Sequence, residues 1–140
     1  MFCDVRTPRI GDIFMMDFHG VGSEQNGWRP GLVFQNNVGN AKSPNIIALP
    51  LTGSVKKLSQ PTHVFLPKAL GLKCDSMVLC ENPQRMSKGC IGAFIITLPD
   101  QYMCQVAAAS LLATSAIAYL DPDFLLSLWQ KAVILNETAA

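Results

Sequence analysis

The sequence predicts a mainly β fold, a small β-barrel with helices at its C-terminal end. Three observations support this fold class. The chain has 140 residues, which suits one domain with its own hydrophobic core. Between Ile10 and Thr97 it consists of short β-branched or aromatic segments separated by Gly, Pro and Asn. After Thr97 the composition shifts to Ala, Leu and Met, which favour helix.

Six short segments before residue 98 are predicted strands, with turn-forming segments between them. Short strands that close on themselves leave few exposed edges, and this favours a barrel over a flat sheet. The predicted turns are residues 19–27, 36–44, 53–61 and 81–89. The predicted strands are Asp12–Asp17, Gly31–Gln35, Asn45–Leu51, Thr62–Leu66, Ser76–Cys80 and Ala93–Ile96.

Two helices are expected after the strands. Thr97-Leu98-Pro99-Asp100 offers a capping threonine, an early proline and an acid in the first turn, a combination typical of a helix start. Apolar side chains then recur at helical spacing until Asp121-Pro122-Asp123 interrupts them. A second helix is predicted from Phe124 to about Leu135. The single domain 1–140 thus divides into a barrel (1–97), a first helix (98–120) and an additional helix with a tail (121–140).

Composition limits the classes of function that fit this chain. Its net charge is only +1, so it lacks the overall basic surface of a non-specific nucleic-acid binder. Any contact with RNA must therefore come from a local patch. Hydrophobic residues make up 49% of the chain and charged residues 15%, which is more apolar surface than a small monomer easily buries. We infer a buried interface between subunits.

The five cysteines favour neither a disulfide framework nor a metal site. Their number is odd and no two are spaced C-x-x-C, so no zinc, other metal or cofactor is expected. The N-terminal residues do not resemble a secretory signal. The longest apolar run, Val106–Leu120, is too short to span a bilayer. We expect a cytoplasmic protein without a membrane partner.

Two residues at predicted strand ends suit an attack on an RNA phosphate. Arg29 follows a polar, Gly-containing loop, and its planar fork can donate two parallel hydrogen bonds to phosphate oxygens while staying charged. Thr52 ends another strand, and its hydroxyl can donate to a phosphate oxygen. Each has an ordinary alternative, because Arg29 could pair with Glu24 across the loop and Thr52 could simply favour a strand end. Only the two residues together indicate a catalytic site.

The proton acceptor for such a reaction has two candidates. His63 lies on a predicted strand and its imidazole titrates in a suitable range, although it could equally be a solvated side chain. Glu81 follows an apolar strand, and its carboxylate could act as a base or contact a nucleobase edge. The sequence leaves the choice open.

Binding of single-stranded RNA requires aromatic faces and amide groups near the same strand ends. Phe18 and Trp28 flank the first loop and could stack on bases. Amide side chains are frequent nearby, although they also occur in loops simply because they form turns. The candidate RNA-binding residues are Phe18, Glu24, Gln25, Trp28, Asn36, Ser54, Lys56, Asn82 and Gln84.

Several of these segments, in this order, resemble one known family. They are Arg9-Ile10-Gly11-Asp12-Ile13, the stretch from Gly22-Ser23-Glu24-Gln25 through Arg29-Pro30 to Gln35-Asn36, Asn40 with Ser43-Pro44, Pro50-Leu51-Thr52, Pro61-Thr62-His63-Val64, and Gly71-Leu72 through Asp75-Ser76. Together they are similar to the MazF/PemK (also Kid) toxins of type II toxin–antitoxin systems. The resemblance covers about Arg9 to Leu120.

The resemblance implies an SH3-like barrel of the MazF/CcdB type and a homodimer with RNA in grooves at its interface. It implies a sequence-selective, metal-independent endoribonuclease, an mRNA interferase, that cleaves single-stranded mRNA to 2′,3′-cyclic phosphate and 5′-hydroxyl ends. An antitoxin segment would occupy the same groove. Arg29 and Thr52 fall on the catalytic positions of the family. Glu24, Asn36, Glu81 and Asn82 fall near its RNA contacts.

The chain departs from the family pattern in two places. Gln84 stands where the family often has an arginine, and Arg85 is displaced by one position. The second helix, from Asp123, lies beyond the usual end. Three alternatives therefore accompany the enzyme: a weakened relative that only binds RNA or antitoxin, a gyrase inhibitor like CcdB, and a plain SH3-like interaction module. The Trp-Gly-Ile end on which CcdB proteins depend is absent, since this chain ends Asn136-Glu137-Thr138-Ala139-Ala140.

Overall fold

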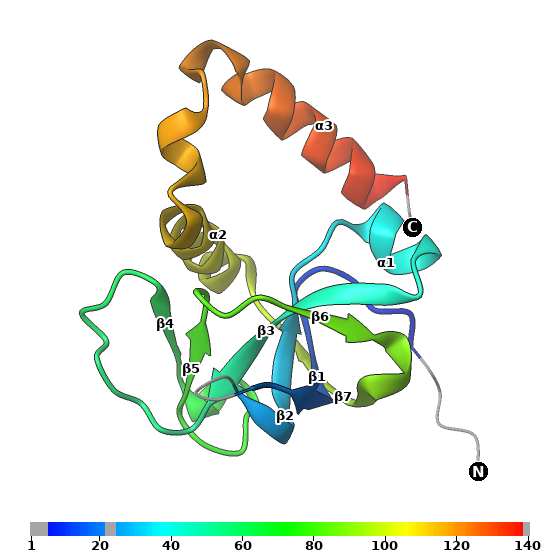
Figure 1. The fold of residues 1–140 in the computed structure, drawn as a ribbon, viewed down its shortest axis with the longest axis vertical. Coiled ribbons are helices and arrows are strands. Elements are labelled where there is room, and N and C mark those ends of the chain that lie inside the picture. The colour runs from blue at the N-terminus through cyan, green and yellow to red at the C-terminus, as the bar shows by residue number, and fades with distance from the viewer. Residues whose placement is uncertain (1–5, 22–24, 139–140) are drawn as a thin grey trace.

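The computed structural model describes residues 6–21 and 25–138, which form an antiparallel sheet with helices beside it (Figure 1). This agrees with the predicted fold class. The strands are β1 (Asp12–His19), β2 (Asn26–Val33), β3 (Asn45–Thr52), β4 (His63–Leu66), β5 (Ser76–Leu79), β6 (Gln84–Ser87) and β7 (Ile91–Thr97). The α-helices are α1 (Asn37–Lys42), α2 (Asp100–Thr114) and α3 (Leu125–Glu137).

The strands follow one another across the sheet in the order β4-β5-β3-β2-β1-β7. The central strand β3 pairs with β2 along one edge, while its other edge is shared by β6 at Asn45–Ala48 and β5 at Leu51–Thr52. Two partners on one edge require the sheet to bend sharply, which gives it a barrel-like shape. Within the described residues β4 and β7 do not pair, so the barrel is open along one side.

Two apolar clusters hold the bent sheet together. One lies under α2, where Val106 and Ala109 of the helix pack against strand residues such as Leu49 and Leu51. The other lies on the opposite side of β1 and is built around Phe14, Met16 and Phe18 with residues from β2, β3 and β6. Each fully buried Leu, Ile or Phe contributes roughly 1.5–3 kcal/mol. The sequence forms this fold because its strands supply apolar residues to both faces.

Two segments predicted as turns are regular elements in the structure. Residues 36–44 contain the helix α1, which Asn36 caps by accepting a hydrogen bond from the Gly39 N–H at 3.0 Å. The segment 81–89 contains β6, which pairs with the first half of β3. In addition, β2 begins at Asn26 instead of Gly31 and ends at Val33.

The C-terminal helices turn back toward the barrel. The predicted first helix ends at Thr114, because Ser115 adopts a left-handed conformation with φ 56°. A short 3₁₀ helix at Ala116–Tyr119 follows, then a second at Pro122–Phe124 leads into α3. In Figure 1, α3 (orange to red) runs from the far end of α2 back to α1.

Hydrogen bonds hold the end of α3 on the barrel. The main-chain oxygen of Asn136 accepts from Arg9 Nη2 at 3.1 Å and from Asn37 Nδ2 at 3.3 Å. Its side-chain oxygen accepts from the Asn37 N–H at 3.1 Å. The additional helix therefore closes back on α1 and the segment before β1.

Candidate active site

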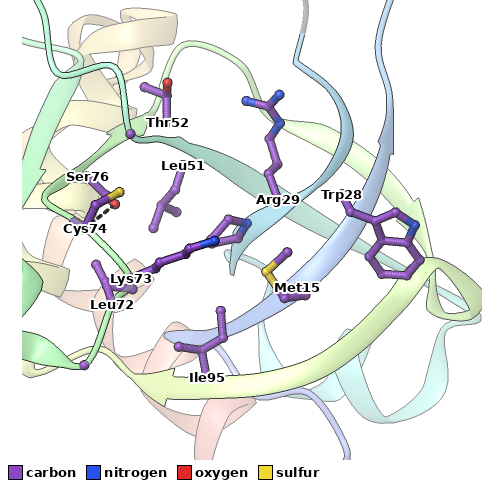
Figure 2. Close-up of a pocket in the computed structure, with 13 residues that line it drawn as sticks. Met15, Trp28, Arg29, Leu51, Thr52, Leu72, Lys73, Cys74, Ser76 and Ile95 are labelled. Carbon is purple, nitrogen blue, oxygen red and sulfur yellow. Dashed lines mark hydrogen bonds between the residues drawn. The ribbon is translucent and has the colours of Figure 1, made fainter.

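Arg29 and Thr52 line the same open pocket, whose volume is about 580 Å³. The register of the sheet explains why. The last paired residues of β2 and β3 are Gly31 and Pro50, and two positions beyond each lie Arg29 and Thr52. Side chains two apart share a face of a strand, so these two would face each other if the ladder continued. Figure 2 shows both pointing to the same side.

The guanidinium of Arg29 is positioned by its own loop. Nη1 donates to Gln25 Oε1, and Nη2 donates to the Asn26 main-chain oxygen at 2.9 Å. Nε is buried and has no hydrogen-bond partner among the described residues. The expected alternative partner, Glu24, lies outside the described residues. Gln25 thus positions Arg29, and the remaining N–H groups are left for a ligand.

The hydroxyl of Thr52 is held as an acceptor and remains free as a donor. Thr52 Oγ1 accepts a hydrogen bond from the Ser54 N–H at 3.1 Å. This fixes the oxygen while leaving the hydroxyl hydrogen to point at a ligand. Ser54 contributes its main chain here, and its exposed side chain does not line the pocket.

The two candidate bases contact each other and do not line the pocket. His63 Nε2 lies 2.9 Å from Glu81 Oε1, and His63 Nδ1 lies 3.2 Å from the Lys57 main-chain oxygen. The His63 side chain is only 9% exposed and that of Glu81 is 33% exposed. Both ring nitrogens face oxygen acceptors, an arrangement that suits a fixed structural pair between β4 and the end of β5.

The two predicted aromatic platforms differ. Trp28 is 59% exposed at the edge of the pocket, and its six-membered ring lies close to Gly92 of β7. A Cβ at Gly92 would lie 2.9 Å from Trp28 Cζ3, so a larger residue there would displace the indole from its present position. Phe18 has no exposed surface and belongs to the core with Phe14 and Met16. Its predicted contact with RNA is therefore corrected, because a buried ring cannot stack on a base.

The remaining predicted RNA contacts do not line the pocket. Asn36 is exposed, but its side-chain oxygen caps α1. Lys56 is exposed in the loop before β4, and Asn82 is half-buried in the turn after β5. Gln84 lies on β6 opposite Ala48, and its buried Nε2 has no hydrogen-bond partner among the described residues.

The segment that forms the far wall of the pocket belongs to the stretch of residues 71–76, which carried part of the family resemblance but was not predicted to line the site. Residues 71–74 contribute Lys73 and Cys74 to it. Gly71 has φ 114°, and a Cβ there would lie 2.9 Å from Ile96 Cγ2, so this turn requires glycine. The only signal in the sequence was a glycine followed by a polar stretch, which is typical of any turn.

The described cysteines form no disulfide bonds. Within the described residues Cys74, Cys80, Cys90 and Cys104 are all free. Burial raises the pKa of the Cys80 thiol to about 11, so this side chain is neutral at physiological pH. The described part of the chain contains no group of three His, Cys, Asp or Glu residues placed to hold a metal ion. None of its helices is long and apolar enough to cross a membrane.

The sequence and the fold both match one group of known proteins. The family model for the PemK-like, MazF-like toxin of type II toxin–antitoxin systems matches residues 9–112. The chain is 37% identical over 100 residues to endoribonuclease MazF of Staphylococcus saprophyticus, covering 70% of this chain and 83% of that protein. It is 36% identical over 111 residues to endoribonuclease EndoA of Bacillus subtilis, covering 78% and 96%.

Solved structures show the same fold. The crystal structure of MazF from Deinococcus radiodurans superposes with a TM-score of 0.70 at 23% identity, covering 79% of this chain and 98% of that one. The region that the family model matches, residues 9–112, includes all the strands and most of α2, whereas α3 lies beyond it. With the family model matching well over half of its length, this chain belongs to the PemK-like, MazF-like toxin family of type II toxin–antitoxin systems.

Proposed function

We propose that this chain is an endoribonuclease toxin that cleaves single-stranded mRNA. One observation carries the proposal: Arg29 and Thr52, from different strands, converge on one open pocket. Two relatives that are 37% and 36% identical to it over the aligned residues are named endoribonucleases. The pocket therefore supplies this chain with groups suited to the activity of its relatives.

The reaction needs few groups from the protein. The 2′-hydroxyl next to the scissile phosphate attacks the phosphorus, and charge develops on the non-bridging oxygens. Arg29 stabilises this charge with N–H groups that its loop has already positioned, and Thr52 donates its hydroxyl to one of the same oxygens. A fixed donor is more effective than water because it does not have to reorient during the reaction.

The products follow from this mechanism. Attack by the 2′-oxygen leaves a 2′,3′-cyclic phosphate on one fragment and a 5′-hydroxyl on the other. The nucleophile comes from the RNA itself, so we propose that cleavage proceeds without a metal ion. Trp28 supports selectivity for single-stranded RNA, because its exposed indole at the edge of the pocket could stack only on an unpaired base.

The positions of the two candidate bases support a structural role for them. His63 and Glu81 were the alternatives, and both lie outside the pocket and hydrogen-bond to each other. A general base must come within hydrogen-bonding distance of the proton that it removes. We propose that this pair holds β4 against the end of β5. Solvent then accepts the proton of the 2′-hydroxyl.

The partners are proposed from the family and the surface. A cognate antitoxin follows from the type II system named by the family model. Exposed apolar side chains on α2 and α3, such as Leu112 and Trp129, support a homodimer. We place the protein in the cytoplasm, where its mRNA substrate lies. Light scattering coupled to gel filtration would contradict the dimer if it gave the mass of one chain.

The proposed activity can be tested with a long RNA in the presence of EDTA. The unaltered protein should produce discrete fragments with cyclic phosphate ends, and Arg29→Ala should abolish them. The control is Lys42→Ala, which removes one positive charge from the exposed end of α1, outside the pocket. Intact RNA with the unaltered protein would overturn the proposal. If binding were retained without cleavage, the chain would be the weakened relative instead.

A further inference from the structure

The pocket contains a second cation that the sequence did not single out. Lys73 lines it, and Figure 2 shows this side chain extending from the wall formed by Leu72 and Cys74 toward the middle of the pocket. Within the described part of the chain no ion pair or hydrogen bond engages its ammonium group. Its side chain is exposed, and it shares the open pocket with Arg29 and Thr52.

The main chain around Lys73 is held in place from both sides. Leu72 is 6% exposed and packs into the core under α2, so the next residue points away from that core. On the other side the Ser76 hydroxyl donates to the Cys74 main-chain oxygen at 3.0 Å. A Cβ at Gly53 would lie only 3.0 Å from Cys74 Sγ, so the segment lies directly against the residue after Thr52. The start of the lysine side chain is thus fixed beside Thr52.

The reaction needs a proton donor that Arg29 and Thr52 cannot provide. The leaving 5′-oxygen is a poor leaving group as an alkoxide, so it must receive a proton as its bond to phosphorus breaks. An arginine does not give up its proton in proteins. Threonine would itself become an alkoxide. His63 and Glu81 lie outside the pocket.

Two titratable groups in the pocket remain, Lys73 and Cys74. An ammonium is attracted by the phosphate and becomes neutral after it donates its proton. A thiol would become an anion beside another anion, which is electrostatically unfavourable. Lysine is therefore the better donor at this position.

We propose that Lys73 is a catalytic residue that donates a proton to the leaving 5′-oxygen, an assignment that rests on the proposed function. In this step the 2′-oxygen forms a bond to phosphorus and its proton passes to solvent hydroxide. The bond between phosphorus and the 5′-oxygen breaks, and its electron pair stays on that oxygen. The oxygen takes a proton from Lys73 Nζ, and the neutral amine regains one from water.

An RNA with sulfur in place of the leaving 5′-oxygen tests this role. A thiolate leaves readily without a proton, so this substrate does not require a general acid. The cut site is first mapped on a long RNA, and oligonucleotides with oxygen or sulfur at that site are then compared under single-turnover conditions. Lys73→Ala should slow cleavage of the oxygen substrate by about 10²- to 10⁴-fold. It should cleave the sulfur substrate at nearly the rate of the unaltered protein.

Matched variants separate proton donation from simple charge. Lys73→Arg keeps the positive charge but cannot give up a proton, so it should show the same selective defect as Lys73→Ala. Arg29→Ala should slow both substrates, because both develop charge on the phosphate. Lys68→Ala removes an exposed lysine outside the pocket and should change neither rate. Circular dichroism of each variant confirms that it is folded.

Each remaining outcome overturns the assignment. Equal slowing of both substrates by Lys73→Ala would mean that this residue only binds phosphate, and no slowing would mean that it is not used. If Cys74→Ser cleaved the oxygen substrate slowly but the sulfur substrate at the normal rate, the proton donor would be the Cys74 thiol instead of Lys73. In all three cases the proposed endoribonuclease function would stand. If the unaltered protein cleaved neither RNA, the function and the assignment would fail together.

Discussion

At the scale of single residues, Asp12 illustrates how a short sequence motif determines structure. Its carboxylate has no exposed surface and accepts from Arg6 Nε and Nη2, both at 3.1 Å, from the Arg9 N–H at 3.0 Å and from the Thr97 hydroxyl at 2.9 Å. These donors come from the segment before β1 and from the end of β7. The aspartate of the Gly-Asp-Ile motif therefore joins the first and last strands of the barrel.

We predict that Asp12→Asn destabilises the protein by about 2–3 kcal/mol. The amide has the same shape but only one oxygen and no charge, so at least one donor loses its partner and the others lose a charge-assisted bond. Urea unfolding monitored by circular dichroism measures the change. Arg6→Ala serves as a comparison and should cost less, because the Arg6 side chain is 43% exposed. Equal unfolding midpoints for Asp12→Asn and the parent would contradict the prediction.

A second prediction concerns pH and Cys80. Burial raises the pKa of this thiol to about 11, whereas its ordinary value is 9.0. Between these values the unfolded state has lost the proton while the folded state still holds it, so unfolding releases a proton. The contribution to stability is therefore complete below pH 9 and is lost as the pH rises through 11.

The Cys80→Ala variant isolates this effect from other groups that titrate in alkali. The free energy of unfolding of the parent should fall more steeply between pH 9 and 11 than that of the variant. Slopes are compared instead of absolute values, because removal of the sulfur also leaves a small cavity. Parallel slopes would show that the thiol does not titrate with a raised pKa.

At the scale of elements, the contact between β2 and β7 prepares a surface for stacking. The six-membered ring of Trp28 in β2 lies close to Gly92 of β7, and the residue is 59% exposed beside the pocket. A ring that already packs against the sheet loses less conformational entropy when a base stacks on it.

We predict that Trp28→Ala weakens binding of an RNA that carries a 2′-deoxy residue at the cut site and so cannot be cleaved. The expected loss is about 1–3 kcal/mol per stacked base, or about 5- to 150-fold in Kd. Trp129→Phe is the matched control, since the second tryptophan of the chain lies on α3. In that background, Trp28 fluorescence should be quenched by the RNA. An unchanged Kd for Trp28→Ala would remove this residue from the binding surface.

The elements also show what the sequence could and could not predict. Arg29 and Thr52 were predictable as a pair because each follows or precedes an apolar strand segment, although β2 extends past Arg29 to Asn26. Phe18 was placed wrongly because the first strand was ended at Asp17. Continued to His19, the same alternation assigns Phe18 to the core face with Phe14 and Met16. That error was one of strand length.

Other features depend on tertiary contacts that no local pattern reveals. The segment 36–44 is rich in Asn and Gly, which form turns, yet it is a helix because Asn37 and Asn40 are buried and hydrogen-bonded to neighbouring segments. Lys73 was one of several scattered cations and was not predicted as a site residue, because its position depends on the turn at Gly71 and on the contact between Cys74 and Gly53. Both are long-range arrangements of ordinary turn residues.

At the scale of the whole molecule, the pocket and α3 are separate. All residues that line the pocket fall between Met15 and Ile95, whereas α3 contacts α1 and the segment before β1. The additional helix α3 therefore supplies no residue to the pocket and packs on a different part of the barrel. We therefore expect that removal of α3 leaves the cleavage rate unchanged.

We predict that a chain truncated after Leu120 still cleaves RNA at the rate of the full chain. Its free energy of unfolding should fall by about 2 kcal/mol, since the three hydrogen bonds to Asn136 are lost. Full-length Asn136→Ala is the control. It should lose only the contribution of the hydrogen bond that the Asn136 side-chain oxygen accepts from the Asn37 N–H. A truncated chain that folds by circular dichroism but does not cut RNA would show that α3 takes part in the reaction.

The hydrogen bond between Arg9 and Asn136 has one more consequence. It brings a residue near each end of the described chain together, with Arg9 Nη2 only 3.1 Å from the Asn136 oxygen. A short linker could therefore join the ends, and new ends could be opened between the exposed residues Leu58 and Ser59. Such a circular permutant should keep the same barrel, with its new ends in the loop between β3 and β4.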